Sequence, residues 1–364
     1  MKLPTSYLAP GMILARPVYG QRGVLLLNRG VSLTSFDISA LRRHGVLAVY
    51  VEGPLSEEEL REARAVMEEE VRVHTMNVVR SWAENGRRRA NFASIVDQVK
   101  SVVDEILAGR MPTNALSEIS AADSYTFAHS VDVCVLSVAA GVRLGYKRDD
   151  LLKLGVGALL HDLGKSRVPP EILNKPGKLT PAEFAEMKKH PVWGYKMLRE
   201  DMDGWVDSVS AAIVLNHHER YDGSGYPRGL KGKEIHLTAA VCAAADMYNA
   251  ITTDRVYRPA LPPHEAYEML MGAGGSALDF RAVQAFLPCV DPYPAGTLIR
   301  LSTGEIAVVL SSDPAMPFRP KVMLVATGEI VDLQKELAVV ITGLLPPVEA
   351  RAMAAGMRPA RAAV

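Results

Sequence analysis

Histidine and aspartate side chains are concentrated in the middle third of the chain. Five of the nine histidines fall within about ninety residues, and two aspartates accompany them in apolar segments. Imidazole and carboxylate groups together suit iron, manganese or zinc, whereas magnesium prefers oxygen ligands alone. Seven such groups exceed the three or four protein ligands of one ion, so they predict two divalent metal ions, with iron or manganese ahead of zinc. The seven are His129, His161, Asp162, His190, His217, His218 and Asp246.

Two of these ligand pairs stand where a helix is expected to end. His161–Asp162 closes the apolar run LLKLGVGALL, and His217–His218 closes AAIVLN. Neighbouring side chains on a helix point about 100° apart, so both members of a pair can approach one ion only at a helix end. Asp162 is the expected bridge because it directly follows a ligand histidine. We assign one ion to His129, His161, Asp162 and Asp246, and the other to Asp162, His190, His217 and His218.

Asp246 lies in the alanine-rich segment TAAVCAAADMYNAI, which predicts a closely packed helix. A buried carboxylate without a partner costs several kcal/mol, so a cation should face it. An arginine or lysine is the ordinary partner, and with five histidines nearby a divalent metal explains the residue at least as well. His129 shares a helical stripe with Val133, Leu136 and Ala140, which turns it inward.

The elements that position these residues belong to a mainly α fold, a helical bundle flanked by small β-rich units. Glycine-punctuated apolar runs predict hairpins near the N-terminus, helical periodicity dominates the middle, and alternating patterns return after Tyr293. The predicted parts are a small β-rich domain over 1–53, linker helices over 54–110, a catalytic helical domain over 111–288, a small antiparallel β unit over 289–345 and a flexible tail over 346–364.

The predicted linker carries two helices. Ser56 and Glu59 form a capping box that opens a long polar helix, and a second helix bears an apolar stripe from Phe92 to Leu107. The stripe fits a homodimer interface or packing against the chain's own catalytic bundle, and both alternatives stay open. Because residues 1–110 contain no ligand-like cluster, we expect them to regulate or dimerise the protein and to take no part in chemistry.

Composition excludes several classes of protein. The 364 residues include 41 Lys and Arg and 41 Asp and Glu, a zero net charge that argues against a protein that coats duplex nucleic acid. Cys134, Cys242 and Cys289 are odd in number and far apart, so we expect reduced core thiols. The chain has no apolar run of about 18 residues and no signal-peptide pattern, which predicts a cytoplasmic protein without a membrane partner.

Five motifs in this region resemble the HD-GYP subfamily of HD-domain phosphohydrolases. They are His161-Asp-Leu-Gly-Lys165, Lys189-His-Pro191, Asn216-His-His-Glu-Arg-Tyr-Asp-Gly-Ser-Gly-Tyr-Pro227, Ala245-Asp-Met-Tyr-Asn-Ala250 and Thr253-Asp-Arg-Val-Tyr-Arg258. The resemblance covers about residues 112 to 288. It implies a bacterial signalling enzyme, a metal-dependent phosphodiesterase that hydrolyses cyclic di-GMP to linear pGpG and in some members on to GMP.

The resemblance also implies roles for residues around the metals. Lys165 is expected to contact the phosphate or stabilise the leaving oxygen, and its ordinary explanation is a solvated lysine after a helix end. Arg255 and Arg258 are expected to grip the second phosphate or stack on guanine. Gly225 would let the backbone approach the ligand and Tyr226 would be a platform for a base, although the loop could also be a plain turn.

Two positions depart from the family pattern. Members with a third metal carry a glutamate where this chain has Tyr125, which favours two metals, and many members carry an aspartate where this chain has Asn249. Because Asn249 is not a predicted ligand, we expect it to tune the site. Two rival functions remain, a non-catalytic signalling module that binds a partner such as a diguanylate cyclase, and another HD-type nucleotide phosphohydrolase. The complete set of ligands favours the cyclic di-GMP enzyme.

Overall fold

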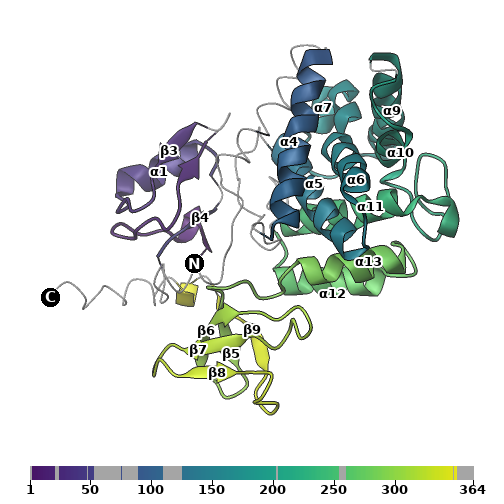
Figure 1. Cartoon of the computed structure of the whole chain (residues 1–364). Helices are drawn as coiled ribbons and strands as arrows, with labels where there is room; N and C mark the ends of the chain where they lie inside the picture. Colours follow the sequence, from purple (N-terminus) through teal and green to yellow (C-terminus); the bar gives the residue numbers. More distant parts are fainter. Residues whose placement is uncertain are drawn as a thin grey trace. The chain divides into compact units, whose positions relative to one another are not determined.

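The computed structural model divides the chain into two compact units (Figure 1). One unit contains Met1–Ala65, Glu118–Tyr125 and Asp291–Val364, and the other contains Val66–Ser117 and Thr126–Val290. The residues described are 2–20, 24–46, 48–52, 75, 89–109, 125–201, 204–253, 260–346 and 348–350.

The second unit is a bundle of helices, drawn from blue through teal to green in Figure 1. Helix α6 lies against both α4 and α10, α10 also packs on α9, and α11 packs on α12 and α13. Its main helices are α4 (Arg89–Leu107), α5 (Tyr125–Arg143), α6 (Arg148–Leu160), α9 (His190–Asp201), α10 (Ser208–Asn216), α11 (Leu237–Thr252), α12 (Pro263–Ala273) and α13 (Phe280–Phe286). Shorter elements are the 3-10 turns Leu163–Arg167, Gly232–Glu234 and Leu287–Cys289 and the helices α7 (Pro170–Leu173) and α8 (Pro181–Met187).

Local capping explains where several of these helices begin. Thr180 and Glu183 form a capping box at the start of α8, in which each side chain accepts a hydrogen bond from the other residue's backbone N–H. Asp207 and Asp279 accept the first free N–H groups of α10 and α13. Because these signals lie within one turn of the helix start, they fix where each helix begins without help from the rest of the fold.

The apolar stripe of α4 packs inside the chain's own bundle. Ile95, Val99 and Val103 are buried to 1% exposure or less. Gly155 of α6 makes room for this contact, since a Cβ atom there would lie 2.6 Å from Val99 Cγ1. This is the second of the two alternatives for the stripe, so the stripe gives no support for a dimer. Helix α4 therefore packs on α6 as a member of the helical bundle.

Both β-rich ends of the chain lie in the first unit. Near the N-terminus, β1 (Lys2–Pro4) pairs with β4 (Ala48–Tyr50), β2 (Val18–Tyr19) pairs with β3 (Leu25–Leu27), and α1 covers Ser35–Arg43. The C-terminal part is one antiparallel sheet of five strands in the order β8-β7-β6-β5-β9. These strands are β5 (Leu298–Leu301), β6 (Ile306–Ser311), β7 (Lys321–Leu324), β8 (Ile330–Asp332) and β9 (Ile341–Leu344).

The two ends share a hydrophobic core. Leu14, Leu41 and Val49 from the N-terminal strands and helix belong to the same cluster as Val308 and Leu345. This shared core differs from the expectation of two separate units over 1–53 and 289–345, because nothing local in either segment points to a partner so far along the chain. A mainly helical fold with small β units at both ends is confirmed.

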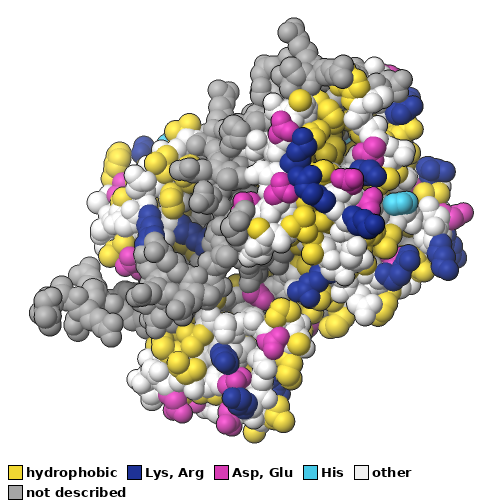
Figure 2. Space-filling view, viewed as in Figure 1, with side chains coloured by type: hydrophobic (Ala, Val, Ile, Leu, Met, Phe, Trp, Pro, Cys, Tyr) yellow, Lys and Arg dark blue, Asp and Glu magenta, His cyan; other side chains and the backbone are white. Residues whose placement is uncertain are grey.

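The remaining sequence expectations concern thiols, membranes and surface charge. Cys134, Cys242 and Cys289 are buried and free of disulfides, as expected. Within the described ranges, each helix is too short or too polar to span a bilayer. On the face drawn in Figure 2, acidic and basic side chains are interspersed over the described surface. That mixture agrees with the zero net charge.

Candidate metal centre

The structure brings all seven predicted ligands together inside the helical bundle. Five elements supply them: His129 comes from α5, His190 begins α9, and Asp246 lies in α11, while the two pairs follow the last residues of α6 and α10. They form two groups, and within each group the possible ligand atoms all lie within 4.8 Å of one another. One group is Asp162, His190, His217 and His218, and the other is His129, His161 and Asp246.

Asp162 lies between the two groups and turns one carboxylate oxygen toward each. Its Oδ1 atom is 3.3 Å from His190 Nε2 and 3.8 Å from His217 Nε2. Its Oδ2 atom is 3.3 Å from His161 Nε2 and 3.7 Å from His129 Nε2. This is the arrangement that a carboxylate bridging two cations requires.

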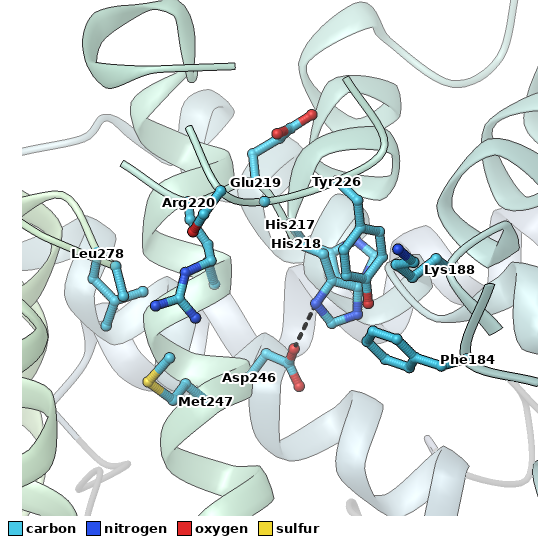
Figure 3. Close-up of a pocket in the computed structure, with 14 residues that line it drawn as sticks. Phe184, Lys188, His217, His218, Glu219, Arg220, Tyr226, Asp246, Met247 and Leu278 are labelled. Atoms are coloured by element: carbon cyan, nitrogen blue, oxygen red, sulfur yellow. Dashed lines mark ion pairs between the residues drawn. The ribbon is translucent and has the colours of Figure 1, made fainter. Parts of the chain in front are cut away.

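Asp246 closes the first group and faces the second. Its Oδ1 atom is 3.0 Å from His129 Nε2 and 4.0 Å from His161 Nε2, and its Oδ2 atom is 3.9 Å from His218 Nδ1. Figure 3 shows this last pair as a dashed line at the pocket. Histidines therefore surround the carboxylate of Asp246, and a metal ion bound by the same side chains would supply the cation that the sequence predicts there.

Backbone carbonyls orient three of the ligand histidines. The Nδ1 atom of His161 donates to the carbonyl of Ala158 at 2.7 Å, and that of His190 donates to Met187 at 2.8 Å. His217 Nδ1 donates to the carbonyl of Val214 at 3.0 Å. With Nδ1 carrying the proton, the lone pair of each Nε2 faces the cluster and can bind a metal.

His129 is oriented by side chains instead. Its Nδ1 atom donates to Asn249 Oδ1 at 2.7 Å, and Asn249 Nδ2 donates to Asp132 Oδ2 at 3.2 Å. All three residues are buried, with 3% exposure each. The carboxylate of Asp132 requires a donor, so it holds the amide nitrogen of Asn249 toward itself and the amide oxygen toward His129. The unusual Asn249 thus contacts a ligand, which gives a physical basis to the expected tuning.

The electrostatics of the cluster suit metal ligation. Burial lowers the pKa of His218 to about 3, and burial together with His218 lowers the pKa of His217 well below its usual value. Burial raises the pKa of Asp162, but Lys165 and His161 outweigh it and hold that pKa well below the usual range. Neutral imidazoles and an ionised carboxylate are the protonation states that bind metal ions.

Two further observations test the fit of a metal. Among the described residues, His161 Nε2 and Asp162 Oδ1 are buried and have no hydrogen-bond partner. A buried polar atom left unsatisfied costs about 1–3 kcal/mol, and more when charged, so both atoms call for a cation. For His161, burial lowers the pKa, while Asp162 and Asp246 outweigh it and raise that pKa. The excess negative charge is what a metal would neutralise. The residues therefore fit a mixed nitrogen and oxygen metal site.

Close contact between Gly164 and the start of α9 brings His190 near Asp162. A Cβ atom on Gly164 would lie 1.9 Å from the carbonyl oxygen of His190 and 2.6 Å from the backbone nitrogen of Gly194. The turn that follows Asp162 can approach the start of α9 only because Gly164 has no side chain. The sequence analysis quoted this glycine in a motif but did not assign it this role.

The segment around Tyr226 folds back onto the end of α10. Glu219 is buried, and its two carboxylate oxygens accept hydrogen bonds from the backbone nitrogens of Arg228 at 2.7 Å and Leu230 at 2.9 Å. A Cβ atom on Gly225 would lie 2.3 Å from the backbone nitrogen of Arg220, so this position requires glycine. The Tyr226 nitrogen donates to the carbonyl of His218 at 3.1 Å. The loop is therefore tied to a metal ligand.

Tyr226 is a wall of the pocket that opens beside the metal ligands. Its ring centroid lies 4.8 Å from that of His218, with 32° between the ring planes. Burial, Asp162 and Asp246 raise the pKa of its hydroxyl, which stays protonated. The pocket has a volume of about 420 Å³ and also contains Gly225, His218 and Asp246 (Figure 3). Both predicted loop residues therefore line it.

Sequence reasoning missed three residues of this pocket. Phe184, Lys188 and Arg220 contribute an aromatic ring and two cations to its walls. Phe184 and Lys188 lie in or just after α8, whose pattern is that of an ordinary surface helix, so only spatial proximity identifies them. Lys165 pairs with Asp162 Oδ2 at 2.5 Å. Arg255 and Arg258 lie outside the described residues.

Comparisons with known proteins agree with this geometry. Residues 113–281 match the family model of the HD domain, and residues 298–352 match a KOW domain associated with the HD domain. The second match covers the C-terminal sheet, whose family the sequence analysis did not identify. A chain described as an HDG"Y"P protein from Bdellovibrio bacteriovorus has a similar fold, with a TM-score of 0.51 at 19% identity over 79% of this chain and 98% of that one.

Two curated relatives are named cyclic di-GMP phosphodiesterases. The protein from Pseudomonas aeruginosa is 37% identical over 268 residues, which are 71% of this chain and 64% of the relative. The protein from Thermotoga maritima is 38% identical over 174 residues, 48% of this chain and 46% of the relative. This chain therefore spans less than two thirds of either relative. All seven candidate ligands lie within the residues that match the HD domain, so the candidate metal centre belongs to that domain.

Proposed function

We propose that this protein is a metal-dependent phosphodiesterase that hydrolyses cyclic di-GMP to pGpG at a centre of two divalent ions. The position of Asp162 carries the proposal, because one of its oxygens faces each ligand group. One ion would be held by His129, His161, Asp162 and Asp246, and the other by Asp162, His190, His217 and His218. Two bound cations would supply a hydroxide near neutral pH and neutralise charge on the phosphate.

The protein's own residues would position the substrate and balance charge. Lys165 neutralises one oxygen of Asp162 and, once ions bind there, its ammonium group can turn to the phosphate or the leaving oxygen. Arg220 lies in the pocket wall and offers a guanidinium for the second phosphate. Arg255 and Arg258 keep the same proposed role. The volume of about 420 Å³ and the mixture of aromatic and basic walls suit a nucleotide.

The identity of the metal and substrate can be tested together. We expect protein purified without oxygen to contain about two ions of iron or manganese per chain. It should hydrolyse cyclic di-GMP and lose this activity when a chelator removes the metal. Nucleoside triphosphates serve as the control substrates. A preference for triphosphates would replace the proposal with a different HD-type nucleotide phosphohydrolase.

The rival hypothesis of a non-catalytic signalling module predicts a damaged metal centre. All seven ligands are present and converge, so nothing in the site favours it. A diguanylate cyclase as partner, a homodimer and a regulatory role for the N-terminal residues remain predictions. The proposed reaction belongs to second-messenger signalling in a bacterial cytoplasm.

A further inference from the structure

Two aromatic rings form a corner at the outer end of the pocket. The ring of Phe184 lies 6.4 Å from that of Tyr226, centroid to centroid, with an angle of 82° between the planes. Tyr226 in turn stands over the metal ligand His218. Figure 3 shows Phe184 and Lys188 on the same side of the pocket, with Tyr226 between them and the His217–His218 pair. The rings thus lead outward from the metal centre.

Phe184 adds little to the packing of the fold. It lies on the short helix α8, and 47% of its surface is exposed. A single exposed aromatic residue needs no explanation by itself. Here, however, the ring lines a pocket and stands perpendicular to a second ring. A flat base in such a corner can stack on one ring while its edge meets the other, which is a favourable pair of aromatic contacts.

Lys188 supplies the charge at this corner. Its Nζ atom lies 5.2 Å from the centroid of the Phe184 ring, and the residue lines the pocket. Among the described residues, no carboxylate lies within ion-pair distance of Lys188. The carboxylate of Glu219 is engaged by the backbone of Arg228 and Leu230. The ammonium group of Lys188 is therefore available to a ligand.

The ligand chemistry that fits this corner is a purine with an acceptor edge. Guanine presents two acceptors, O6 and N7, side by side, whereas adenine presents N7 beside an amino group that donates. A lysine can donate to both guanine atoms but only to one of adenine. In a nucleotide the sugar separates the base from the phosphate. In the pocket, Tyr226 lies next to His218 and Phe184 lies next to Tyr226, so a phosphate at the metal centre leaves the base near Phe184.

We propose that Phe184, Tyr226 and Lys188 form the base-binding subsite of the pocket and that Lys188 selects guanine over adenine. The inference rests on the proposed function, since it places one base of the cyclic dinucleotide while a phosphate lies at the metal centre. Phe184 supplies stacking, and Lys188 supplies the discrimination.

The test compares Phe184→Leu and Lys188→Met with the wild type on cyclic di-GMP and cyclic di-AMP. With cyclic di-GMP, Phe184→Leu should raise KM about tenfold and leave kcat within about twofold, because stacking on an aromatic ring is lost. Lys188→Met should lower the preference for cyclic di-GMP over cyclic di-AMP, measured as the ratio of kcat/KM, about tenfold. Both variants should keep the metal content of the wild type, because neither residue belongs to the two ligand groups.

Matched controls exist elsewhere in the chain. Phe36 is also exposed, at 72%, with the guanidinium of Arg43 5.8 Å from its ring, so Phe36→Leu should change nothing. Lys153→Met removes an exposed lysine that pairs with Asp150 and should also be silent. An unchanged KM in Phe184→Leu, or unchanged base preference in Lys188→Met, overturns the subsite. Loss of bound metal in either variant would also overturn it, since the kinetic change would then come from damage to the metal centre.

Binding separates this inference from the proposed function. Isothermal titration of the full chain with GMP and with AMP should give tighter binding of GMP, weakened in both variants and equal to that of AMP in Lys188→Met. If the wild type hydrolyses no cyclic dinucleotide but shows this pattern, the proposed function fails and the subsite stands. If it hydrolyses cyclic di-GMP but binds GMP and AMP equally, only the subsite fails.

Discussion

The Nδ1 atom of His129 donates to the Oδ1 atom of Asn249 at 2.7 Å, and this contact joins the metal centre to a buried polar chain that ends at Asp132. An amide can present either its oxygen or its nitrogen to a neighbour. Asp132 decides between them, because its carboxylate accepts from Asn249 Nδ2. The orientation of His129, a proposed metal ligand, therefore depends on a residue two contacts away.

Replacing Asn249 with leucine should weaken metal binding about 10–100-fold, the usual effect of removing the hydrogen-bond partner of a histidine that binds a metal. The His129 ring would lose the acceptor that fixes its proton on Nδ1. Asn249→Asp supplies an acceptor but sets a second carboxylate against Asp132, so Asn249→Asp with Asp132→Asn should bind metal better than Asn249→Asp alone. Metal content after dialysis against graded chelator measures each step. Wild-type retention in Asn249→Leu would remove Asn249 from this role.

Asp162→Ala should abolish hydrolysis and remove more than one ion per chain, because each of its oxygens faces a different ligand group. His217→Ala should deplete mainly one ion, since it belongs to one group only. Mass spectrometry of the bound metal distinguishes the two outcomes, with circular dichroism to show that both variants are folded. Two retained ions with near-normal turnover in Asp162→Ala would refute the bridging role.

Ile95→Ala in α4 should reduce the free energy of unfolding by about 2–4 kcal/mol, the usual cost of a cavity in a packed core. Ile95 is 0% exposed and belongs to the stripe that packs on α6. Leu107 of the same helix is 48% exposed, and Leu107→Ala should cost much less. Urea unfolding of the two variants gives the comparison.

Because α4 covers apolar surface of α6, a chain that begins near residue 111 should be poorly soluble, whereas one that retains α4 should fold.

Asp279→Ala should cost about 1 kcal/mol of stability at neutral pH, because Asp279 caps α13 and accepts from Arg281 Nη2 at 3.0 Å. Burial raises the pKa of Asp279, but the hydrogen bonds from Arg281 outweigh it and lower the pKa below 3.8. A carboxyl group whose pKa is lower when folded stabilises above its unfolded pKa, and this contribution disappears as the pH falls through the folded pKa. The difference between wild type and variant, measured in chelator, should therefore shrink in acid. A constant difference would contradict this.

The three cysteines should be unreactive in the folded protein. Burial raises the pKa of Cys134 and of Cys289 to about 12, and burial followed by the nearby Asp246 raises that of Cys242. Only the thiolate reacts with a disulfide reagent. Ellman's reagent should therefore detect almost no thiol in native protein and three per chain in guanidinium. A thiol that reacts rapidly in the native protein would show that the segment around that cysteine opens readily.

Residue types and short motifs were enough to single out the seven side chains that the structure brings together and to predict a mainly helical middle region. Helix α11 (Leu237–Thr252) contains the alanine-rich segment around Asp246, and α4 (Arg89–Leu107) contains the apolar stripe that begins at Phe92. Caps, prolines and apolar periodicity act within one or two turns, so they can be read without knowledge of the fold. The ligand chemistry is equally local, because imidazole and carboxylate carry it wherever they lie.

Only the tertiary structure decided how these residues face one another. That Asp162 divides its two oxygens between the ligand groups depends on the packing of several helices and on the contact of Gly164 with α9. The same holds for Phe184 and Lys188, whose local sequence is that of a surface helix, and for the core shared by Leu14 and Val308. Such contacts join residues far apart in the chain, and the free energy that forms them comes from packing, which no local pattern records.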